Sequence, residues 1–365
     1  MYAKRPIDNC QPAIHNPRML TPPIEPMLAK LTEAIPEGPG WHYEPKWDGS
    51  RCIVFFDGAN PPYLQSRDLK PLGRYFPELE EQLAEALPRA AVLDGEIVIM
   101  GPNGLEFDTL QLRLHPAESR VRKLAAETPA AYVAFDLLAD GDDDLRARPF
   151  AERRQRLESL LASAAAPLHL TPATRDHLVA RDWFDRFEGA GLDGVIAKRV
   201  DGPYQPGVRA MAKIKHLRTV DAVVAGFRWN KGEEGRSVGS LLLGLYDEEG
   251  TLHHVGHTSS FKATEKRALV EMLAPFVTED ETSGFGRGRT PGTPSRWSTG
   301  KDTAWVRLRP ELVCEVTFDY LQGPRFRHAA TFRHWRSDKA PAACTFGQLE
   351  AVVPAELRDV FEGGR

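Results

Sequence analysis

The segment EPKWDGSR, residues 44–51, places a lysine in a tight Asp-Gly turn directly before a predicted strand. A lysine amine can act as a nucleophile only when it is neutral, and its reference pKa of about 10.4 keeps it protonated at pH 7. Neighbouring cations and partial burial lower the pKa of a lysine, so Lys46 is a candidate nucleophile. The same K-x-D-G pattern is also typical of an exposed turn, because three fixed residues recur by chance.

Two further Asp-Gly segments carry carboxylates that can hold a metal ion. In LDGEIV, Glu96 interrupts the apolar alternation of a predicted strand, and in LDGVIAK, Asp193 precedes another strand. Two carboxylates at separate strand ends suit a hard cation such as Mg²⁺ beside phosphates. Each segment alone is equally compatible with a hairpin turn that bears surface acids.

Cations and one aromatic side chain accompany these segments. In MAKIKH the period of a strand places Lys213 and Lys215 on one face, and an anion such as a triphosphate relieves the repulsion between them. An exposed sheet face is the alternative. Phe135 in YVAFDLL can stack on a base or pack in a core, and Arg67 in QSR follows a predicted turn.

Cations also gather toward the end of the chain, in residues 284–309 and 324–339, where RSDK closes the second stretch. These stretches are either solvated faces or surfaces that contact phosphates, since Lys and Arg supply most sequence-independent affinity for DNA. The whole chain has no basic excess, because 47 Lys and Arg stand against 51 Asp and Glu, a net charge of −4. The charge pattern therefore indicates local rather than global contact with nucleic acid.

The 365 residues are enough for about two domains. Four cysteines without a CxxC pair argue against a disulfide framework or a zinc site, and no apolar run has the length of a membrane span or a signal peptide. We therefore expect a protein of the reducing cytoplasm. The sequence also lacks G-x-x-x-x-G-K-[ST], a G-x-G-x-x-G after a strand, H-E-x-x-H and G-x-S-x-G.

The hydrophobic pattern predicts an α+β domain with a largely antiparallel sheet, followed by a small β barrel of the OB type. Residues 1–40 read as an extended arm, and residues 282–303 as a mobile loop. The expected strands are 51–56, 91–100, 131–138, 194–200, 210–216, 222–229, 240–246, 252–258, 312–321 and 326–335, and the expected helices are 77–87, 149–162, 175–191 and 263–276. A hinge is expected near residues 216–221.

The order of these segments resembles that of the covalent nucleotidyltransferase superfamily, and most closely that of the ATP-dependent DNA ligases. The likeness runs from about residue 22 to about residue 340 and rests on EPKWDGSR, QSR, LDGEIV, YVAFDLL, LDGVIAK and KIK, followed by RSDK. Each segment is weak by itself, but their joint order and spacing are specific. The stretch VRLRPELVCEV and the terminal RSDKAP are similar to the core-only bacterial ligase C group.

The resemblance implies three parts: an N-terminal extension (1–20), an antiparallel-sheet nucleotidyltransferase or adenylation domain (21–217), and an OB-fold domain with a C-terminal tail (218–365). It gives Lys46 the attack on the α-phosphate of ATP. The implied nucleotide contacts are Glu44 at the adenine, Phe135 stacked on it, Arg51 and Arg67 at the ribose and phosphates, Glu96 at the ribose or metal, Lys213 and Lys215 at the α-phosphate, Lys198 in support, and Arg336 and Lys339 at the departing pyrophosphate.

The resemblance further implies that Glu96 and Asp193 support Mg²⁺ or Mn²⁺. The family usually has Glu at the position of Asp193, whose side chain is one methylene shorter, so a metal contact through water is expected there. Related chains often carry Trp at the position of Ala212, before Lys213.

The implied activity is the sealing of nicks between 3′-hydroxyl and 5′-phosphate ends of double-stranded DNA, in DNA repair, replication or recombination. The expected protein is a cytoplasmic, nucleoid-associated bacterial monomer, with repair proteins as possible partners and no membrane contact. An RNA ligase and an mRNA guanylyltransferase share the lysine motif and the two-domain plan, so the motif alone leaves them open. A noncatalytic nucleic-acid-binding protein is the alternative from another class.

Overall fold

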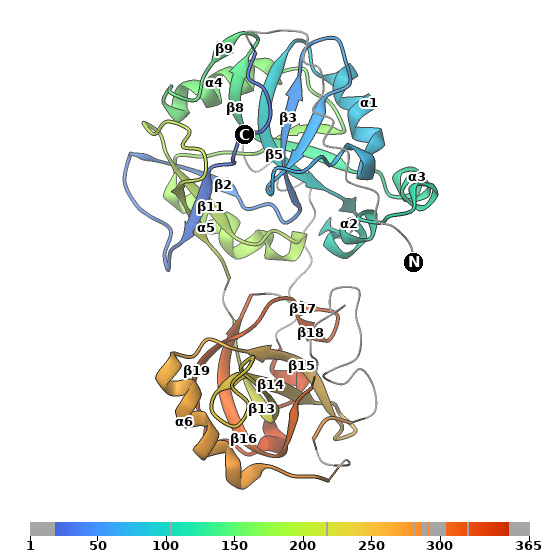
Figure 1. Ribbon diagram of the computed structural model, residues 1–365. Coiled ribbons are helices and arrows are strands. Elements are labelled where there is room, and N and C mark those ends of the chain that lie inside the picture. Colours follow the sequence, from blue (N-terminus) through green and yellow to red (C-terminus); the bar gives the residue numbers. More distant parts are fainter. Residues whose placement is uncertain are drawn as a thin grey trace. The chain divides into compact units, whose positions relative to one another are not determined.

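The computed structural model describes residues 19–102, 104–216, 218–280, 282, 284–286, 291, 304–319 and 321–349. The chain divides into two compact units, and the boundary between them falls between Lys215 and His216 (Figure 1). Most of the expected loop 282–303 and residues 1–18 of the expected N-terminal extension lie outside the described residues.

Within the part of the chain that is described, the N-terminal unit is built from two main β-sheets and five α-helices. Its strands are β1 (Leu28–Leu31), β2 (Trp41–Pro45), β3 (Ser50–Phe56), β4 (Tyr63–Ser66), β5 (Ala91–Val98), β8 (Ala131–Asp140), β9 (Asp143–Asp144), β10 (Leu168–Leu170), β11 (Val195–Arg199) and β12 (Arg209–Ile214), with a small hairpin of β6 (Met100–Gly101) and β7 (Gly104–Leu105). Its helices are α1 (Pro77–Ala86), α2 (Phe107–Arg113), α3 (Glu118–Glu127), α4 (Phe150–Leu160) and α5 (His177–Arg186).

The two sheets are mainly antiparallel. The smaller has the order β1-β12-β11-β2, and the larger has the order β10-β8-β5-β3-β4, with β9 paired to β8. Among the strand pairs of these two sheets that the structure describes, the β1–β12 and β10–β8 pairs are parallel and the others are antiparallel. The expected α+β class with an antiparallel sheet is thereby confirmed.

Side chains alternate along the strands, so each sheet has one face that packs against helices and one face that packs against the other sheet. On β3, Cys52 and Val54 pack in the core that Leu79 and Leu83 of α1 also join, whereas Ile53 packs toward the smaller sheet. Helix α5 covers the opposite face of the smaller sheet through Ala180, among other contacts. Because side chains alternate between faces, the layers are helices, larger sheet, smaller sheet and α5. The inner faces of the two sheets thus face each other.

The C-terminal unit is a five-stranded barrel with one α-helix among the described residues. Its strands are β13 (Arg218–Trp229), β14 (Val238–Tyr246), β15 (Leu252–Thr258), β16 (Val306–Phe318) and β19 (Thr331–Trp335), beside a small hairpin of β17 (Leu321–Gln322) and β18 (Arg325–Phe326). Helix α6 (Ala263–Leu273) contributes Leu269 and Leu273 to the barrel core. The sheet order is β15-β14-β13-β16-β19.

A parallel bridge closes this sheet. Thr258 at the end of β15 pairs with Ala330 just before β19, and the N–H of Ala330 donates to the carbonyl oxygen of His257 at 2.9 Å. The third and fifth strands therefore meet, and the helix lies between the third and fourth strands. That arrangement is an OB fold, which confirms the expected barrel.

The structure corrects three expectations about individual elements. The arm expected over residues 1–40 contains β1, and Met19, Ile24 and Met27 are buried in the core. The short helices α2 and α3 were not expected, because their polar sequences lack a long apolar stripe. The strand expected over 326–335 is interrupted, with β18 ending at Phe326 and β19 beginning at Thr331.

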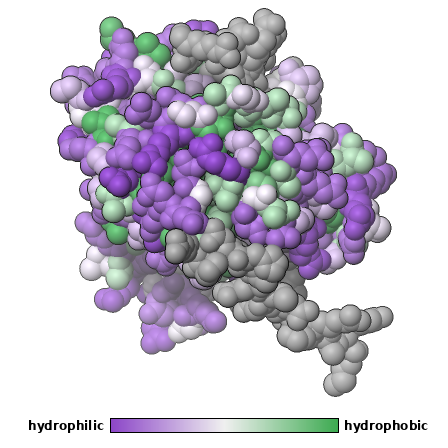
Figure 2. All heavy atoms as spheres, turned by 90° about the horizontal axis from the view of Figure 1, so that it is seen from above, coloured by the Kyte–Doolittle hydropathy of each residue, from purple (hydrophilic) through white to green (hydrophobic). Residues whose placement is uncertain are grey.

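Polar residues predominate on the face of the molecule shown in Figure 2, and hydrophobic residues lie between them in small groups. Within the described part of the chain, no helix is both long and apolar enough to cross a membrane.

A buried ion pair between β8 and α4 is expected to contribute strongly to stability. Arg153 donates to Asp136 at 2.8 and 2.9 Å, and both side chains are almost fully buried. Replacing Asp136→Ala leaves the guanidinium buried without this partner, so we expect the free energy of unfolding to fall by about 3–5 kcal/mol. Denaturant unfolding monitored by circular dichroism measures the change.

The matched control is Asp143→Ala. Asp143 pairs with Arg156 at 2.6 Å, but their side chains are 45% and 36% exposed. We expect a loss of less than about 1 kcal/mol, because water screens an exposed pair. Equal losses in the two variants would contradict the role given to burial.

Candidate active site

Lys46 follows β2 and lies beside the turn that precedes β11. The backbone N–H of Lys46 donates to the carbonyl oxygen of Gly194 at 2.8 Å, and the N–H of Asp193 donates to the carbonyl oxygen of Lys46 at 3.0 Å. These bonds extend the antiparallel pairing of β2 with β11. The pairing of two segments far apart in sequence therefore fixes the position of the lysine.

One carboxylate oxygen joins two lysines at this point. Asp193 Oδ2 lies 2.7 Å from Lys46 Nζ and 2.6 Å from Lys215 Nζ, and the three side chains are between 14% and 18% exposed. Burial by itself raises the pKa of Asp193, but the two lysines outweigh burial and hold that pKa below its usual value. Asp193 is therefore a carboxylate shared by two ammonium groups.

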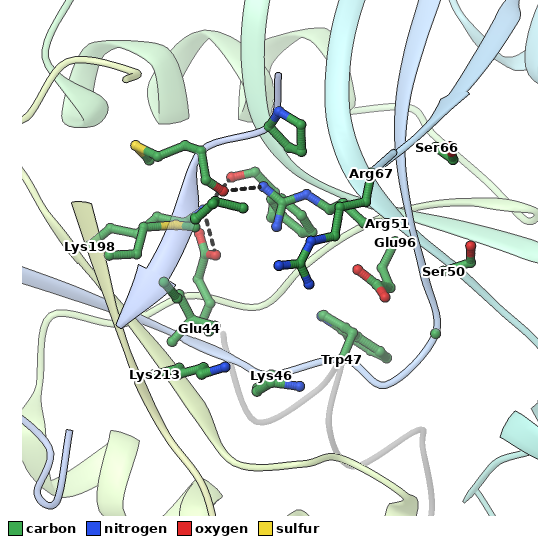
Figure 3. A pocket seen from close by; sticks show the side chains of 18 of the residues that line it. Glu44, Lys46, Trp47, Ser50, Arg51, Ser66, Arg67, Glu96, Lys198 and Lys213 are labelled. Carbon is green, nitrogen blue, oxygen red and sulfur yellow. Dashed lines mark hydrogen bonds and ion pairs between the residues drawn. The ribbon is translucent and has the colours of Figure 1, made fainter. Parts of the chain in front are cut away.

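A cavity of about 470 Å³ opens next to Lys46, between the inner faces of the two sheets. Figure 3 shows charged side chains from both sheets around this space. The cavity brings together most of the residues expected from the sequence: Glu44, Lys46, Arg51, Arg67, Glu96, Phe135, Lys198 and Lys213. Asp193 and Lys215 lie against Lys46 rather than on the cavity lining itself.

The end of the cavity near Lys46 is cationic. Lys213 lies on the inner face of β12, where burial and the nearby charges of Lys215, Lys46 and Arg67 lower its pKa. Three of these cations, Lys46, Arg67 and Lys213, line the cavity. An arrangement of this kind is suited to the phosphates of a nucleotide, because anions offset the repulsion among the cations.

A buried ion pair closes another part of the cavity. Lys198 Nζ lies 2.7 Å from Glu44 Oε2 and also donates to the carbonyl oxygen of Phe135 at 2.8 Å. Glu44 is only 2% exposed, and among the described residues its Oε1 atom has no hydrogen-bond partner. Burial raises the pKa of Glu44 although Lys198 and Arg154 oppose that rise. Oε1 lies 3.8 Å from Nη1 of Arg154, an ion-pair distance that is too long for a hydrogen bond, so this oxygen keeps an unused capacity to accept one.

Arg51 is held by groups that the sequence analysis did not single out. Its Nε and Nη2 atoms donate to the two oxygens of Asp94 at 2.6 Å each, and the hydroxyl of Tyr204 donates to Asp94 at 2.6 Å. The guanidinium lies 4.5 Å from the centre of the Phe135 ring. Asp94 and Tyr204 therefore position Arg51 against Phe135. Asp94 stands two residues before Glu96, so strand alternation could have identified it, but the contact with Tyr204 spans 110 residues.

Glu96 lies on β5 opposite Arg51 of β3. Burial raises the pKa of this carboxyl to about 7, against the opposing effect of Arg51 and Lys46. Within the described ranges, no group of three or more His, Cys, Asp or Glu side chains is arranged to hold a metal ion. Glu96 and Asp193 still fit a divalent cation that takes its remaining ligands from phosphates and water, because Mg²⁺ sites commonly use one or two carboxylates.

The two remaining expected residues, Arg336 and Lys339, belong to the C-terminal unit. Both contact Asp221 of β13, at 3.0 Å from Arg336 Nη1 and 2.9 Å from Lys339 Nζ. Asp221 was not singled out from the sequence either, because 115 residues separate it from Arg336.

The fold and the site define a class. Two antiparallel sheets that enclose a lysine beside a cationic pocket, followed by an OB fold, form the core of a nucleotidyltransferase. A family model described as ATP dependent DNA ligase domain matches residues 26–215, and one described as ATP dependent DNA ligase C terminal region matches residues 234–339. The chain therefore belongs to the ATP-dependent DNA ligases, enzymes that join DNA strands with the use of ATP.

Individual relatives agree with this family. DNA ligase C2 of Mycolicibacterium smegmatis is 51% identical over 340 residues, which cover 90% of this chain and 95% of that protein. DNA ligase C of Mycobacterium tuberculosis is 49% identical over 356 residues, with 94% and 98% covered. A solved structure from a study of Lig E DNA ligases shares the fold, with a TM-score of 0.54, 17% identity and coverage of 86% and 100%. The expected resemblance to the core-only ligase C group is confirmed.

The perturbed carboxyl of Glu96 predicts a pH dependence of stability. Its pKa is about 7 in the folded chain and about 4.5 in the unfolded chain, so the folded state binds more protons between these values. The contribution of Glu96 to stability is therefore fully present below about pH 4.5 and is lost as the pH rises through about 7. The variant Glu96→Gln should not show this loss of stability with rising pH, because glutamine does not ionise.

We expect the free energy of unfolding of the wild type to fall by about 1–3 kcal/mol relative to Glu96→Gln between pH 5 and pH 7.5. Denaturant titrations of both proteins at several pH values, without nucleotide or metal, measure the difference. Parallel curves would mean that Glu96 is ionised throughout, in which case the burial argument for this carboxyl fails.

Proposed function

We propose that Lys46 carries AMP during DNA joining. The amine nitrogen attacks the α-phosphorus of ATP, an N–P bond forms, and the bond from the α-phosphorus to the bridging oxygen breaks, so that pyrophosphate leaves. Attack requires the neutral amine, so the proton that Nζ donates to Asp193 has to leave before the bond forms. The observation that carries this proposal is the placement of Lys46 between a shared carboxylate and a cationic cavity.

The cations around the cavity stabilise the charge that moves in this step. Lys213, Lys215 and Arg67 lie near one another and near Lys46, where they can neutralise the α-phosphate as the leaving group departs. A divalent cation, Mg²⁺ or Mn²⁺, held by Glu96 or Asp193 together with phosphate oxygens would supply further positive charge. Asp193 already contacts two lysines directly, so its short side chain fits a water-mediated metal contact better than a direct one.

The buried pair of Glu44 and Lys198 supports the choice of adenine. Oε1 of Glu44 makes an ion pair with Arg154 at 3.8 Å but no hydrogen bond, so it could accept one from the 6-amino group of adenine, whereas guanine presents an oxygen acceptor at that position. Phe135 lies on the cavity lining, but Arg51 and Lys198 lie 4.5 and 4.8 Å from its ring centre, so stacking of the base on this ring would require one of these cations to move. Arg51 would then be available to the ribose and phosphates. This chemistry disfavours a guanylyltransferase.

Two further transfers complete the proposed reaction. AMP passes from Lys46 to the 5′-phosphate at a nick in double-stranded DNA, and the 3′-hydroxyl then attacks that phosphate and releases AMP. Arg336 and Lys339 of the OB fold would act in the preceding step, the attack of Lys46 on ATP, by orienting the departing pyrophosphate. The hinge expected over residues 216–221 would be shorter than expected, because residues 218–221 already pair with β16 as part of β13. We further propose a monomer that works in DNA repair in a bacterial cytoplasm, in contact with other repair proteins.

Lys46→Ala removes the nucleophile and tests the proposal. We expect the variant to form no AMP adduct and to seal no unadenylated nick, while it keeps part of its activity on nicks whose 5′-phosphate already carries AMP. Intact mass spectrometry after incubation with ATP and Mg²⁺ detects the adduct, and a labelled nicked duplex reports sealing. An adduct of normal yield in Lys46→Ala would refute the assignment.

The control for that experiment is Lys123→Ala, which removes a lysine of the same unit whose side chain is 71% exposed on α3. It should form the adduct and seal both substrates at wild-type rates. Nicked RNA, GTP and NAD used in place of the DNA and ATP distinguish the RNA ligase and the guanylyltransferase from a DNA ligase.

Glu44→Gln is expected to weaken discrimination between ATP and GTP by about 10-fold or more, because the amide offers a donor where the carboxylate offers only acceptors. The ratio of kcat/KM for self-adenylation to that for self-guanylation measures the effect. Glu158→Gln is the matched control, since Glu158 also pairs with Arg154, at 2.7 Å, but is half exposed and lies off the cavity lining. A discrimination ratio that is equal in wild type and Glu44→Gln would rule out this role for Glu44.

A further inference from the structure

Asp221, near the beginning of the OB fold, holds both cations of the RSDK segment. Arg336 Nη1 donates to its two carboxylate oxygens at 3.0 and 3.2 Å, and Lys339 Nζ lies 2.9 Å from Oδ2. The backbone of Asp221 is itself fixed, because Gln348 donates to its carbonyl oxygen at 3.1 Å. The residue is only 8% exposed. These contacts, all within the C-terminal unit, fix the positions of the Arg336 and Lys339 side chains.

The surroundings of Arg336 are rich in carboxylates. Its Nε and Nη2 atoms donate to Asp338 at 2.9 and 2.8 Å, and Glu315 lies 3.8 Å away. Each nitrogen of the guanidinium therefore already donates to a carboxylate. The cluster as a whole combines two cations with three carboxylates, so it offers no net positive charge to an approaching phosphate.

Carboxylates and phosphates accept from a guanidinium in the same paired geometry. An N–H of Arg336 Nη1 that donates to Asp221 is therefore not available to a phosphate oxygen, and one of the three N–H donors of Lys339 is used in the same way. Asp221 is buried behind these cations, so it would not contact the nucleotide itself. Pyrophosphate and this carboxylate therefore compete for the positive charge and for part of the N–H donors of Arg336 and Lys339.

We propose that Asp221 is a positioning residue that competes with the β- and γ-phosphates of ATP for Arg336 and Lys339. In the absence of nucleotide, Asp221 keeps both side chains ordered on the OB fold. When the enzyme binds ATP for adenylation, the contacts of Asp221 with these two side chains break. This inference rests on the proposed function, in which these two cations orient pyrophosphate. It adds a residue that sets the affinity for the triphosphate without touching it.

The test is Asp221→Asn in the full chain, which keeps the shape of the side chain and removes its charge. We expect the KM for ATP in self-adenylation to fall by about 3- to 10-fold, and the KM for pyrophosphate in the reverse release of ATP to fall as well. The kcat for adenylation and the sealing of pre-adenylated nicks should stay near wild type. Asp221→Glu, which restores the carboxylate, should return both KM values toward wild type.

Glu311→Gln is the charge-matched control, because Glu311 belongs to the same unit and pairs with Arg309 at 2.6 Å on the surface. It should leave both KM values unchanged. If Asp221→Asn does not fold, as judged by circular dichroism, Asp221→Ser provides a second neutral replacement for the same measurements.

The outcomes separate this inference from the proposed function. A KM for ATP that rises or stays the same in a folded neutral variant, with a normal AMP adduct on the wild type, overturns the competition and leaves the proposed function intact. A wild type that forms no AMP adduct with ATP and Mg²⁺ overturns the proposed function and this inference together. A fall in both KM values with unchanged sealing of pre-adenylated nicks supports it.

Discussion

The contact on which the active site depends is a single carboxylate placed between two ammonium groups. Asp193 holds Lys46 and Lys215 through the same oxygen, in a setting where little water reaches any of the three. Two lysines this close repel each other, and a partly buried charge without a partner is costly, so neither could occupy its position without Asp193 or another anion. The pairing of β2 with β11 supplies that carboxylate, because it aligns the turn before β11 with the end of β2.

The division of the cavity into differently charged parts follows from the two sheets. Strand alternation sends Arg51, Glu96 and Phe135 inward from the larger sheet, and Glu44 and Lys198 inward from the smaller one. The part near Lys46 carries excess positive charge, whereas Glu44 and Lys198 neutralise each other in the other part. A molecule with an uncharged base at one end and several phosphates at the other matches this pattern, and ATP is such a molecule.

Much of the site could be predicted from short segments, because residues two positions apart on a strand have side chains on the same face. The alternation in MAKIKH placed Lys213 and Lys215 on one face of a strand; in the structure Lys213 lines the cavity, and Lys215, just beyond the end of β12, contacts Asp193. Glu96, which interrupts the apolar pattern of LDGEIV, also lines the cavity. Contacts between distant segments could not be predicted in this way. The hydrogen bond from Tyr204 to Asp94 joins residues that are 110 positions apart in the sequence. The bond from Arg336 to Asp221 joins residues that are 115 positions apart, and no local sequence pattern predicts either contact. The parallel pairing of β1 with β12 was missed for the same reason, since residues 28–31 are too short and too close to prolines to show a strand period.

The two units share one electrostatic device. In the N-terminal unit Asp193 joins Lys46 to Lys215, and in the OB fold Asp221 joins Arg336 to Lys339. Each aspartate keeps a pair of cations ordered and partly neutralised, which avoids the cost of gathering bare like charges in a folded protein. A triphosphate carries more negative charge than either carboxylate, so it can take over the cations that they hold. In the reaction proposed here, nucleotide binding would exchange carboxylate for phosphate on Lys215, Arg336 and Lys339, while Lys46 would leave Asp193 as the neutral nucleophile.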